Sequence, residues 1–461
     1  MSTTALPGAA PLAARRRTTR IYCASTLYGA ATLAAAIDAD CFTATDRSIL
    51  LVLNNSATPE TTPPLDEMAG FDRLRHRFDD VLSWNETIFP FHPGGWSPRA
   101  DDIPLWERYL RLAWDLGDDA VELALESIQV NPSLAISQIF TGAPIDVYAD
   151  GLMSYGPTRN KLDPLVGTRV RRLLHLDLVP GLTPLLLTEF DVQPEVVPTE
   201  VFVKVLGELG DAATTKLPEL RGPALLLGQY LSALEILTGE EEEDLHARMV
   251  RGAVALGHKK IVFKPHPMAP ARWSRQAEDE AEKLGADLTV LDTPVLAEVL
   301  YQRMQPALVV GCFSTALFTA ATFYGLPVAR LGTELLLERL TPYQNSNRVP
   351  VTIVDTMLPE LTDRAMVEAQ LIDPEKQELT GLVTAVGFAM QPKIYPDRRP
   401  DAEAYLSRHL NAHTRRYFKR RRLTALGLPG AVPAQLAFIP RNARLRRVVR
   451  QARALRRSVK R

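Results

Sequence analysis

Short apolar segments of strand length alternate with helical patterns along the first 330 residues, and they fall into two series. In the first series we expect strands at 20–25, 48–53, 87–91 and 145–148, with helices up to residue 37 and over 103–116. The segment 48–53, SILLVL, is apolar throughout, which is typical of a strand buried on both faces of its sheet. Strands that alternate with helices predict an α/β fold with a parallel sheet.

The second series begins near residue 223. Its expected strands are at 223–229, 260–264, 287–291 and 307–311, and its expected helices are at 238–257, 276–284, 294–303 and 314–324. Thr238 followed by Glu241 indicates a capping box at the start of the first of these helices. A helix over 200–209 and a proline-flanked connection separate the two series. Two Rossmann-like halves predict a bilobal enzyme whose site lies in the cleft between them, at the carboxyl ends of the strands.

The overall composition is that of an ordinary globular protein. Of the 461 residues, 46% are hydrophobic and 23% are charged, which excludes a largely disordered or collagen-like chain. The three cysteines Cys23, Cys41 and Cys312 are scattered, so they predict neither a disulfide framework nor a metal site. Because no uncharged apolar run of about 18 residues occurs, we expect no transmembrane helix.

The net charge of −1 conceals a strong asymmetry between the two ends of the chain. Residues 413–461 contain 16 Lys or Arg and no Asp or Glu, so the rest of the chain has a net charge of −17. Basic tails bind anionic surfaces, either nucleic acid or acidic lipid. Leu445, Val448, Val449 and Leu455 would form one apolar stripe on a helix, which favours a membrane surface over a solvated tail. The acidic body and the absence of an RNA- or DNA-binding motif argue against nucleic acid.

Asp150 and Gly151 directly follow the apolar strand expected at 145–148. An acid at the carboxyl end of a strand is well placed to act as a general base, and a glycine beside it permits a tight turn next to a substrate. The alternative interpretation is a simple Asp-Gly turn.

Lys264 and His266 follow the strand expected at 260–264 in the sequence KPHP, where Pro265 and Pro267 restrict the backbone. A lysine and a histidine together suit a phosphate group, one as a charge and the other as a hydrogen-bond donor or acid. The alternative is a rigid structural loop with a capping histidine.

Two further features of the second series could bind a nucleotide. Ser314 and Thr315 open a helix after a strand, so their hydroxyls suit an anion, although Ser and Thr are also ordinary helix caps. Glu298 could accept hydrogen bonds from the hydroxyls of a ribose, or it could be a solvated charge on a helix.

A second His-Pro pair, at His92, lies in the first series near Trp96. A structural loop is the favoured interpretation there, and a sugar-stacking surface is the alternative.

The order of these motifs resembles that of the bacterial sialyltransferases, which share D/E-D/E-G, HP and S/T motifs. Three segments look most like those of the α-2,8-polysialyltransferase family: the motif KPHP, the strand LLLGQ at 225–229 and the segment NNS at 54–56. The resemblance covers about residues 20–400. One departure is Ala149, which stands where the family has the first of two acids, so we assign the role of the acid to Asp150.

The resemblance implies a GT-B fold and an inverting, metal-independent transfer of sialic acid from CMP-sialic acid to a glycan acceptor, with no cofactor. Asp150 would be the base, His266 would donate to the departing phosphate, and Glu298 would hold the ribose. The other residues expected to touch the nucleotide or to shape its turns are Lys264, Pro267, Ser314, Thr315, Gly151 and Gly228.

The expected organisation has four parts. They are a disordered leader over 1–18, an acceptor domain over 19–210, a nucleotide-sugar domain over 211–400 and a basic helical segment over 401–461. The basic segment would hold the enzyme on the inner face of the cell membrane, near lipid-linked acceptors of a capsule or another cell-surface polysaccharide. The alternatives are a CDP-glycerol glycerophosphotransferase, another GT-B transferase with a CMP-like donor, or an inactive nucleotide-binding relic.

Overall fold

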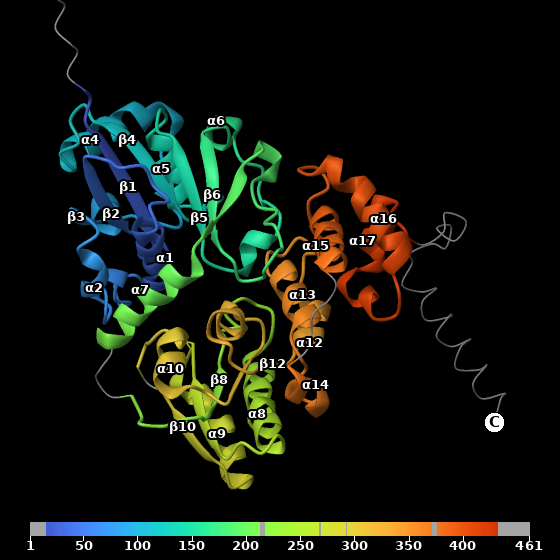
Figure 1. The fold of residues 1–461 in the computed structure, drawn as a ribbon. Helices are drawn as coiled ribbons and strands as arrows, with labels where there is room; N and C mark the ends of the chain where they lie inside the picture. Colours follow the sequence, from blue (N-terminus) through green and yellow to red (C-terminus); the bar gives the residue numbers. More distant parts are fainter. Residues whose placement is uncertain (1–14, 213–216, 267–268, 292, 371–375, 432–461) are drawn as a thin grey trace, which may run out of the picture.

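The chain folds into two lobes, each built on a parallel sheet, with a group of helices from the C-terminal part beside them (Figure 1). The computed structural model describes residues 15–212, 217–266, 269–291, 293–370 and 376–431. The leader expected at 1–18 therefore lies mostly outside the described residues, and the first strand begins at Thr18.

The first sheet has seven strands in the order β3-β2-β1-β4-β5-β6-β7, and every neighbouring pair is parallel. Its strands are β1 (Thr18–Ala24), β2 (Arg47–Val52), β3 (Asp80–Ser83), β4 (Ala120–Leu125), β5 (Ile145–Ala149), β6 (Val170–Leu176) and β7 (Gln193–Val197). Its helices are α1 (Leu27–Asp38), α2 (Asp72–Arg75), α3 (Trp84–Ile88), α4 (Ile103–Ala113), α5 (Ser133–Ile139), α6 (Pro164–Gly167) and α7 (Thr199–Ala212). The order of the first six strands is that of a Rossmann fold, as predicted.

The second sheet has five parallel strands in the order β10-β9-β8-β11-β12. Its strands are β8 (Ala224–Leu227), β9 (Lys260–Lys264), β10 (Asp287–Val290), β11 (Leu308–Gly311) and β12 (Val328–Arg330), and its helices are α8 (Gly239–Ala255), α9 (Arg275–Lys283), α10 (Ala297–Met304) and α11 (Thr315–Phe318). The capping box predicted at Thr238 and Glu241 is confirmed at the start of α8.

The segment 87–91, predicted as a strand, is not one. The strand is β3, and residues 84–88 form α3, because the Ser83 side chain accepts a hydrogen bond from the backbone amide of Glu86 and caps a helix there. Trp84 and Ile88 are buried at a spacing of four, which is a helical spacing, whereas Phe89 is 81% exposed.

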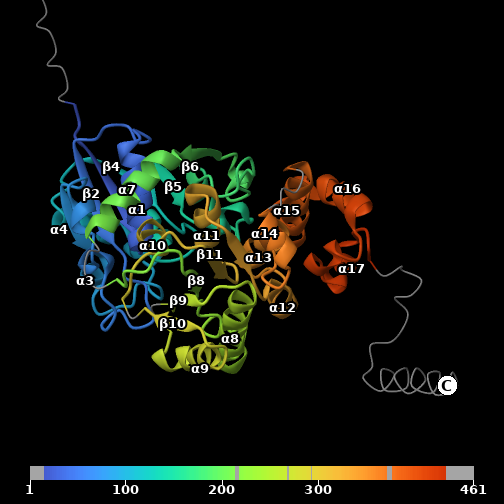
Figure 2. The same ribbon diagram turned by 60° about the horizontal axis from the view of Figure 1, so that its bottom comes forward.

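Six helices follow the second sheet, and those at the end of the chain pack beside the first lobe (Figure 2). They are α12 (Thr333–Arg339), α13 (Arg348–Met357), α14 (Arg364–Ala369), α15 (Lys376–Met390), α16 (Arg399–His409) and α17 (Arg420–Leu426). The first part of the basic segment belongs to this body, since Tyr417 and Leu423 are buried in the core. Residues 432–461, including the predicted apolar stripe, lie outside the described residues.

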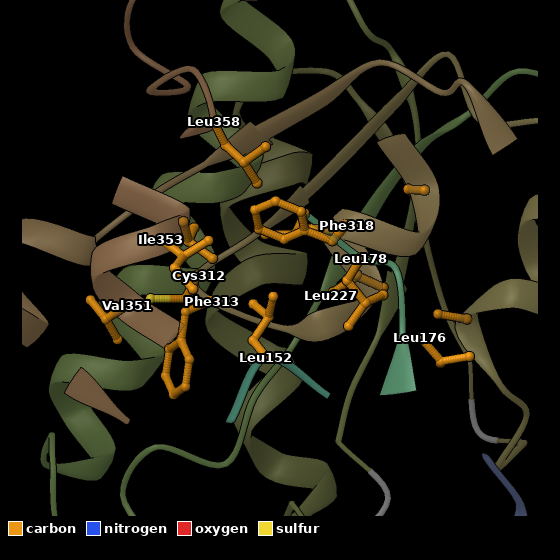
Figure 3. Packing of buried hydrophobic residues seen from close by; sticks show 14 of the residues in the cluster. Leu152, Leu176, Leu178, Leu227, Cys312, Phe313, Phe318, Val351, Ile353 and Leu358 are labelled. Carbon is orange, nitrogen blue, oxygen red and sulfur yellow. The ribbon is translucent and has the colours of Figure 1, made fainter. Parts of the chain in front are cut away.

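One hydrophobic cluster contains side chains from both lobes. In Figure 3, Leu152 and Leu178 of the first lobe lie in the same cluster as Leu227 and Phe318 of the second. Burial of apolar surface contributes about 25 cal/mol per Å², so a shared core favours one relative arrangement of the lobes.

The Tyr395 hydroxyl joins the C-terminal helices to the first lobe. It accepts a hydrogen bond from the Thr158 amide at 2.9 Å and lies 2.8 Å from Glu189 Oε2, to which it donates. We expect Tyr395→Phe to lower the free energy of unfolding by about 1–3 kcal/mol, because a buried amide loses its acceptor. Urea unfolding followed by circular dichroism measures this.

Tyr405→Phe is the matched control. Tyr405 is as buried as Tyr395, at 6% exposure, but its hydroxyl has no hydrogen-bond partner among the described residues. We expect that variant to be no less stable than the parent. Equal destabilisation by the two substitutions would contradict the role of the Tyr395 hydrogen bonds.

Candidate active site

The carboxyl ends of strands from both sheets border one cavity of about 740 Å³. Asp150 and Gly151 line it from the first lobe, and His266, Ser314 and Thr315 line it from the second. The sequence motifs, which are more than 160 residues apart at the extremes, therefore come together in space. An adjoining cavity of about 630 Å³ is bordered by Lys264, Glu298 and Gly228, together with several of the same residues.

The Asp150-Gly151 turn follows β5 and contacts the second lobe. The backbone amide of Leu152 donates a 3.4 Å hydrogen bond to the Thr315 hydroxyl, and a Cβ atom at Gly151 would lie 3.1 Å from the same oxygen. Gly151 has an extended backbone, so the close approach of Thr315 is the reason that a small residue fits there. Burial raises the pKa of Asp150, which suits a group that must accept a proton.

Glu126 is a second carboxylate of this cavity, and the sequence analysis did not identify it. It directly follows β4, which pairs with β5, so it lies one strand away from the Asp150 turn. Burial and the charge of Asp150 raise the pKa of Glu126 to about 7. The signal for it was present in the alternating apolar residues of 121–125, which predict a strand with an acid at its carboxyl end.

Lys264 and His266 lie at the end of β9, where the loop packs closely on Gly228. A Cβ atom at Gly228 would lie 3.2 Å from the Cα of Pro265, and the Gly228 amide donates to the Lys264 carbonyl at 2.9 Å. Burial lowers the pKa of Lys264. Burial, and to a smaller extent the charge of Lys264, also lower the pKa of His266, so a neutral imidazole is favoured at pH 7. Pro267 lies outside the described residues.

Ser314 and Thr315 have different local roles. The Ser314 side chain accepts a 3.2 Å hydrogen bond from the Ala316 amide, so it is the N-cap of α11, in agreement with the simpler alternative. Thr315 faces the first lobe through its contact with Leu152. Both residues line the cavity, so capping does not prevent their hydroxyls from bordering the site.

Glu298 is not the solvated helix charge that was the alternative, because it is only 3% exposed. It lies in the first turn of α10 and accepts a 2.7 Å hydrogen bond from the Thr319 hydroxyl. Burial raises the pKa of Glu298, whereas the Thr319 hydrogen bond and the charge of Lys264 lower it. Glu298 and Lys264 therefore interact electrostatically at the edge of the adjoining cavity.

The second His-Pro pair forms a structural loop, as favoured. His92 Nε2 lies 2.8 Å from the Ser56 carbonyl, and the Gly94 amide donates to His92 Nδ1 at 3.1 Å, so both ring nitrogens are held by backbone groups. Trp96 packs edge-on against Trp106, with 4.8 Å between the ring centroids.

Two Rossmann-like sheets whose carboxyl ends border a common cavity form a fold of the GT-B class. The family model of alpha-2,8-polysialyltransferase matches residues 20–333, about two thirds of the chain. The chain therefore belongs to the α-2,8-polysialyltransferase family, and it is a sialyltransferase. Among curated proteins, no sequence matches it at a significant level.

The solved structures that are similar to this chain include the following three. The GT-B domain of a sialyltransferase from Photobacterium damselae is 12% identical, with 75% of this chain and 98% of that chain covered and a TM-score of 0.40. A Photobacterium 2,6-sialyltransferase in complex with CMP and lactose is 11% identical, with 77% of each chain covered and a TM-score of 0.38. Acinetobacter baumannii MurG is 13% identical, with 83% of this chain and 97% of that chain covered and a TM-score of 0.39.

The described part of the chain lacks two features. None of its helices is both long and apolar enough to cross a membrane. Within the same residues, no group of three or more His, Cys, Asp or Glu side chains is arranged to hold a metal ion.

The charge of Lys264 can be tested through His266. We expect Lys264→Met to raise the pKa of His266, because the lysine charge disfavours the imidazolium. NMR titration of the histidine ring nitrogens measures the change. His258, at the opposite end of β9, is the internal control, since burial alone lowers its pKa and Lys264 is not among the causes. An unchanged His266 titration would contradict the interaction.

Proposed function

We propose that this sialyltransferase transfers sialic acid from CMP-sialic acid to a hydroxyl group of a glycan acceptor, with inversion and without a metal. The observation that carries the proposal is the single cavity bordered by Asp150 on one lobe and by His266, Ser314 and Thr315 on the other. In this proposal residues 19–210 bind the acceptor and residues 211–400 bind the nucleotide sugar.

The second lobe supplies the groups that a cytidine monophosphate needs. Lys264, His266 and the Ser314 and Thr315 hydroxyls all border the adjoining cavity, so a phosphate bound there would have several hydrogen-bond donors around it as charge develops. Glu298, at the edge of the adjoining cavity, suits the two ribose hydroxyls. Gly228 lets the Lys264–His266 loop approach the end of β8 closely.

In the proposed reaction, the acid of the first lobe activates the acceptor and the donors of the second lobe stabilise the leaving group. Asp150 takes the proton of the acceptor hydroxyl, and the hydroxyl oxygen forms a bond to the anomeric carbon of the sialic acid. On the opposite side the bond from that carbon to the phosphate oxygen breaks, and its electron pair leaves with CMP. His266, as a neutral imidazole, donates a hydrogen bond to the leaving phosphate. Attack and departure on opposite faces invert the anomeric carbon, and the donors from the second lobe offset the phosphate charge without a metal.

The basic C-terminal segment supports a peripheral position on the inner face of the cell membrane. Residues 432–461 contain ten Lys or Arg and no acid, and each cation near an anionic surface contributes about 1 kcal/mol. Such a position would bring the site close to lipid-linked acceptors.

Replacement of Asp150 tests the chemistry. We expect Asp150→Asn to reduce transfer by about 10²–10⁴-fold, because the base is lost, while the affinity for CMP changes by less than about threefold. CMP release in the presence of a mixed pool of glycan acceptors measures the rate, and calorimetry measures CMP binding. Asp118→Asn, at an exposed position of the same lobe, should behave as the parent.

Two results would contradict the assignment. Full activity of Asp150→Asn would mean that another group is the base. A parent enzyme that binds CMP and transfers nothing to any acceptor would be the inactive relic.

Removal of residues 432–461 tests membrane binding. The truncation ends after the last described residue, because a shorter chain would lose the buried Tyr417 and Leu423. We expect the 1–431 protein to keep its thermal stability and its activity on soluble acceptors, but to lose binding to phosphatidylserine vesicles. The full chain should bind such vesicles less tightly as salt rises. Equal binding by the two proteins in vesicle flotation would overturn the proposal.

A further inference from the structure

Glu126 lines the same cavity as Asp150, yet the proposed reaction gives it no part. Its carboxylate lies against the start of α1, where Oε2 is 3.2 Å from the position that a Cβ atom of Gly29 would occupy. It also interacts with Ser25, which directly follows β1, and with Tyr148 of β5; β1 and β5 are the two strands beside β4. Among the described residues, no lysine or arginine forms an ion pair with it. A half-buried carboxyl group without a cation is costly as an anion, so a neutral form is favoured.

The hydrogen bonds around Tyr148 are consistent with a neutral Glu126. The Tyr148 hydroxyl lies 2.8 Å from the Cys23 carbonyl and 3.1 Å from Glu126 Oε2, and it has only one proton to donate. If that proton goes to the closer carbonyl, the hydroxyl oxygen can accept a hydrogen bond from a protonated Glu126. In that arrangement the Tyr148 hydroxyl donates to Cys23 and accepts from Glu126.

We propose that Glu126 is a positioning residue that works in its neutral form beside the ionised Asp150, and that loss of its proton reduces activity by weakening donor binding. The proposal rests on the proposed function, in which Asp150 is the base and the donor is CMP-sialic acid. Such a donor carries a carboxylate and a phosphate, so a second negative charge on the cavity wall would repel it. Glu126 also restores a two-acid site in a chain that has Ala149 where its family has the first acid.

The groups that interact with Glu126 are Cys23 and Ser25 at the end of β1 and Tyr148 and Asp150 at the end of β5. Tyr28, Arg159 and His266 are further titratable or charged groups that line the same cavity. The pKa of Glu126 is raised to about 7, first by burial and then by the charge of Asp150. A carboxyl group is neutral below its pKa. Neutral Glu126 is therefore present below about pH 7, and it is lost as the pH rises above this value.

The test is the pH dependence of transfer. For the parent enzyme, KM for CMP-sialic acid should rise above about pH 7, by up to about tenfold per pH unit. Glu126→Gln is always neutral, so it should keep kcat within about threefold of the parent at pH 6 and should lose the rise in KM. Glu67→Gln, at an exposed position of the same lobe, should have the parent profile.

Ser25→Ala provides a second test that leaves Glu126 in place. The hydrogen bonds of Ser25 lower the pKa of Glu126, so removal of its hydroxyl should shift the rise in KM to higher pH. If Glu126→Gln does not fold, the shift of the KM profile in Ser25→Ala still tests the proposal.

Two outcomes would overturn the proposal. A folded Glu126→Gln that is at least about 100-fold slower at every pH would make Glu126 itself the base. A parent-like pH profile in both variants would leave Glu126 without a part in the reaction. Both outcomes are distinct from a failure of the proposed function, which would appear as full activity of Asp150→Asn or as a lack of CMP binding.

Discussion

Parallel pairing of every described strand in both sheets is the constraint on which the site depends. In a parallel sheet all carboxyl ends lie along one edge, so residues that follow different strands meet there although they are far apart in the sequence. Asp150 after β5 and Glu126 after β4 meet in this way on the first lobe, and Lys264 at the end of β9 and Ser314 after β11 meet on the second. The shared hydrophobic cluster and the hydrogen bond from the Leu152 amide to the Thr315 hydroxyl then join the two lobes beside the cavity.

Burial also shifts the pKa values of the ionisable side chains that border the two cavities. Burial raises the pKa of each of its three acids, Asp150, Glu126 and Glu298, and lowers the pKa of Lys264 and His266. Burial therefore disfavours the charged form of each group, and an anionic nucleotide that binds there would favour the charged forms of Lys264 and His266. Such shifts cluster at functional sites because proton transfer needs groups whose two forms are close in free energy.

Much of this arrangement was predictable from the sequence, because buried parallel strands are continuous apolar runs and their ends carry the motifs. The segments 48–53 and 260–264 were found for that reason, as was the capping box at Thr238. The prediction of a strand at 87–91 was wrong, because the apolar residues of this segment lie on a helix capped by Ser83 and on an exposed loop. Glu126 was missed because β4 was not recognised, and the burial of Glu298 follows from tertiary packing, which local patterns do not report.

A crystal structure of the protein with CMP tests the central claim most directly. The account predicts that the phosphate lies within hydrogen-bonding distance of His266 and of the Ser314 or Thr315 hydroxyl, that the ribose hydroxyls face Glu298, and that Asp150 stays free on the acceptor side of the cavity. CMP bound on the first lobe, or a phosphate held away from His266, would contradict it.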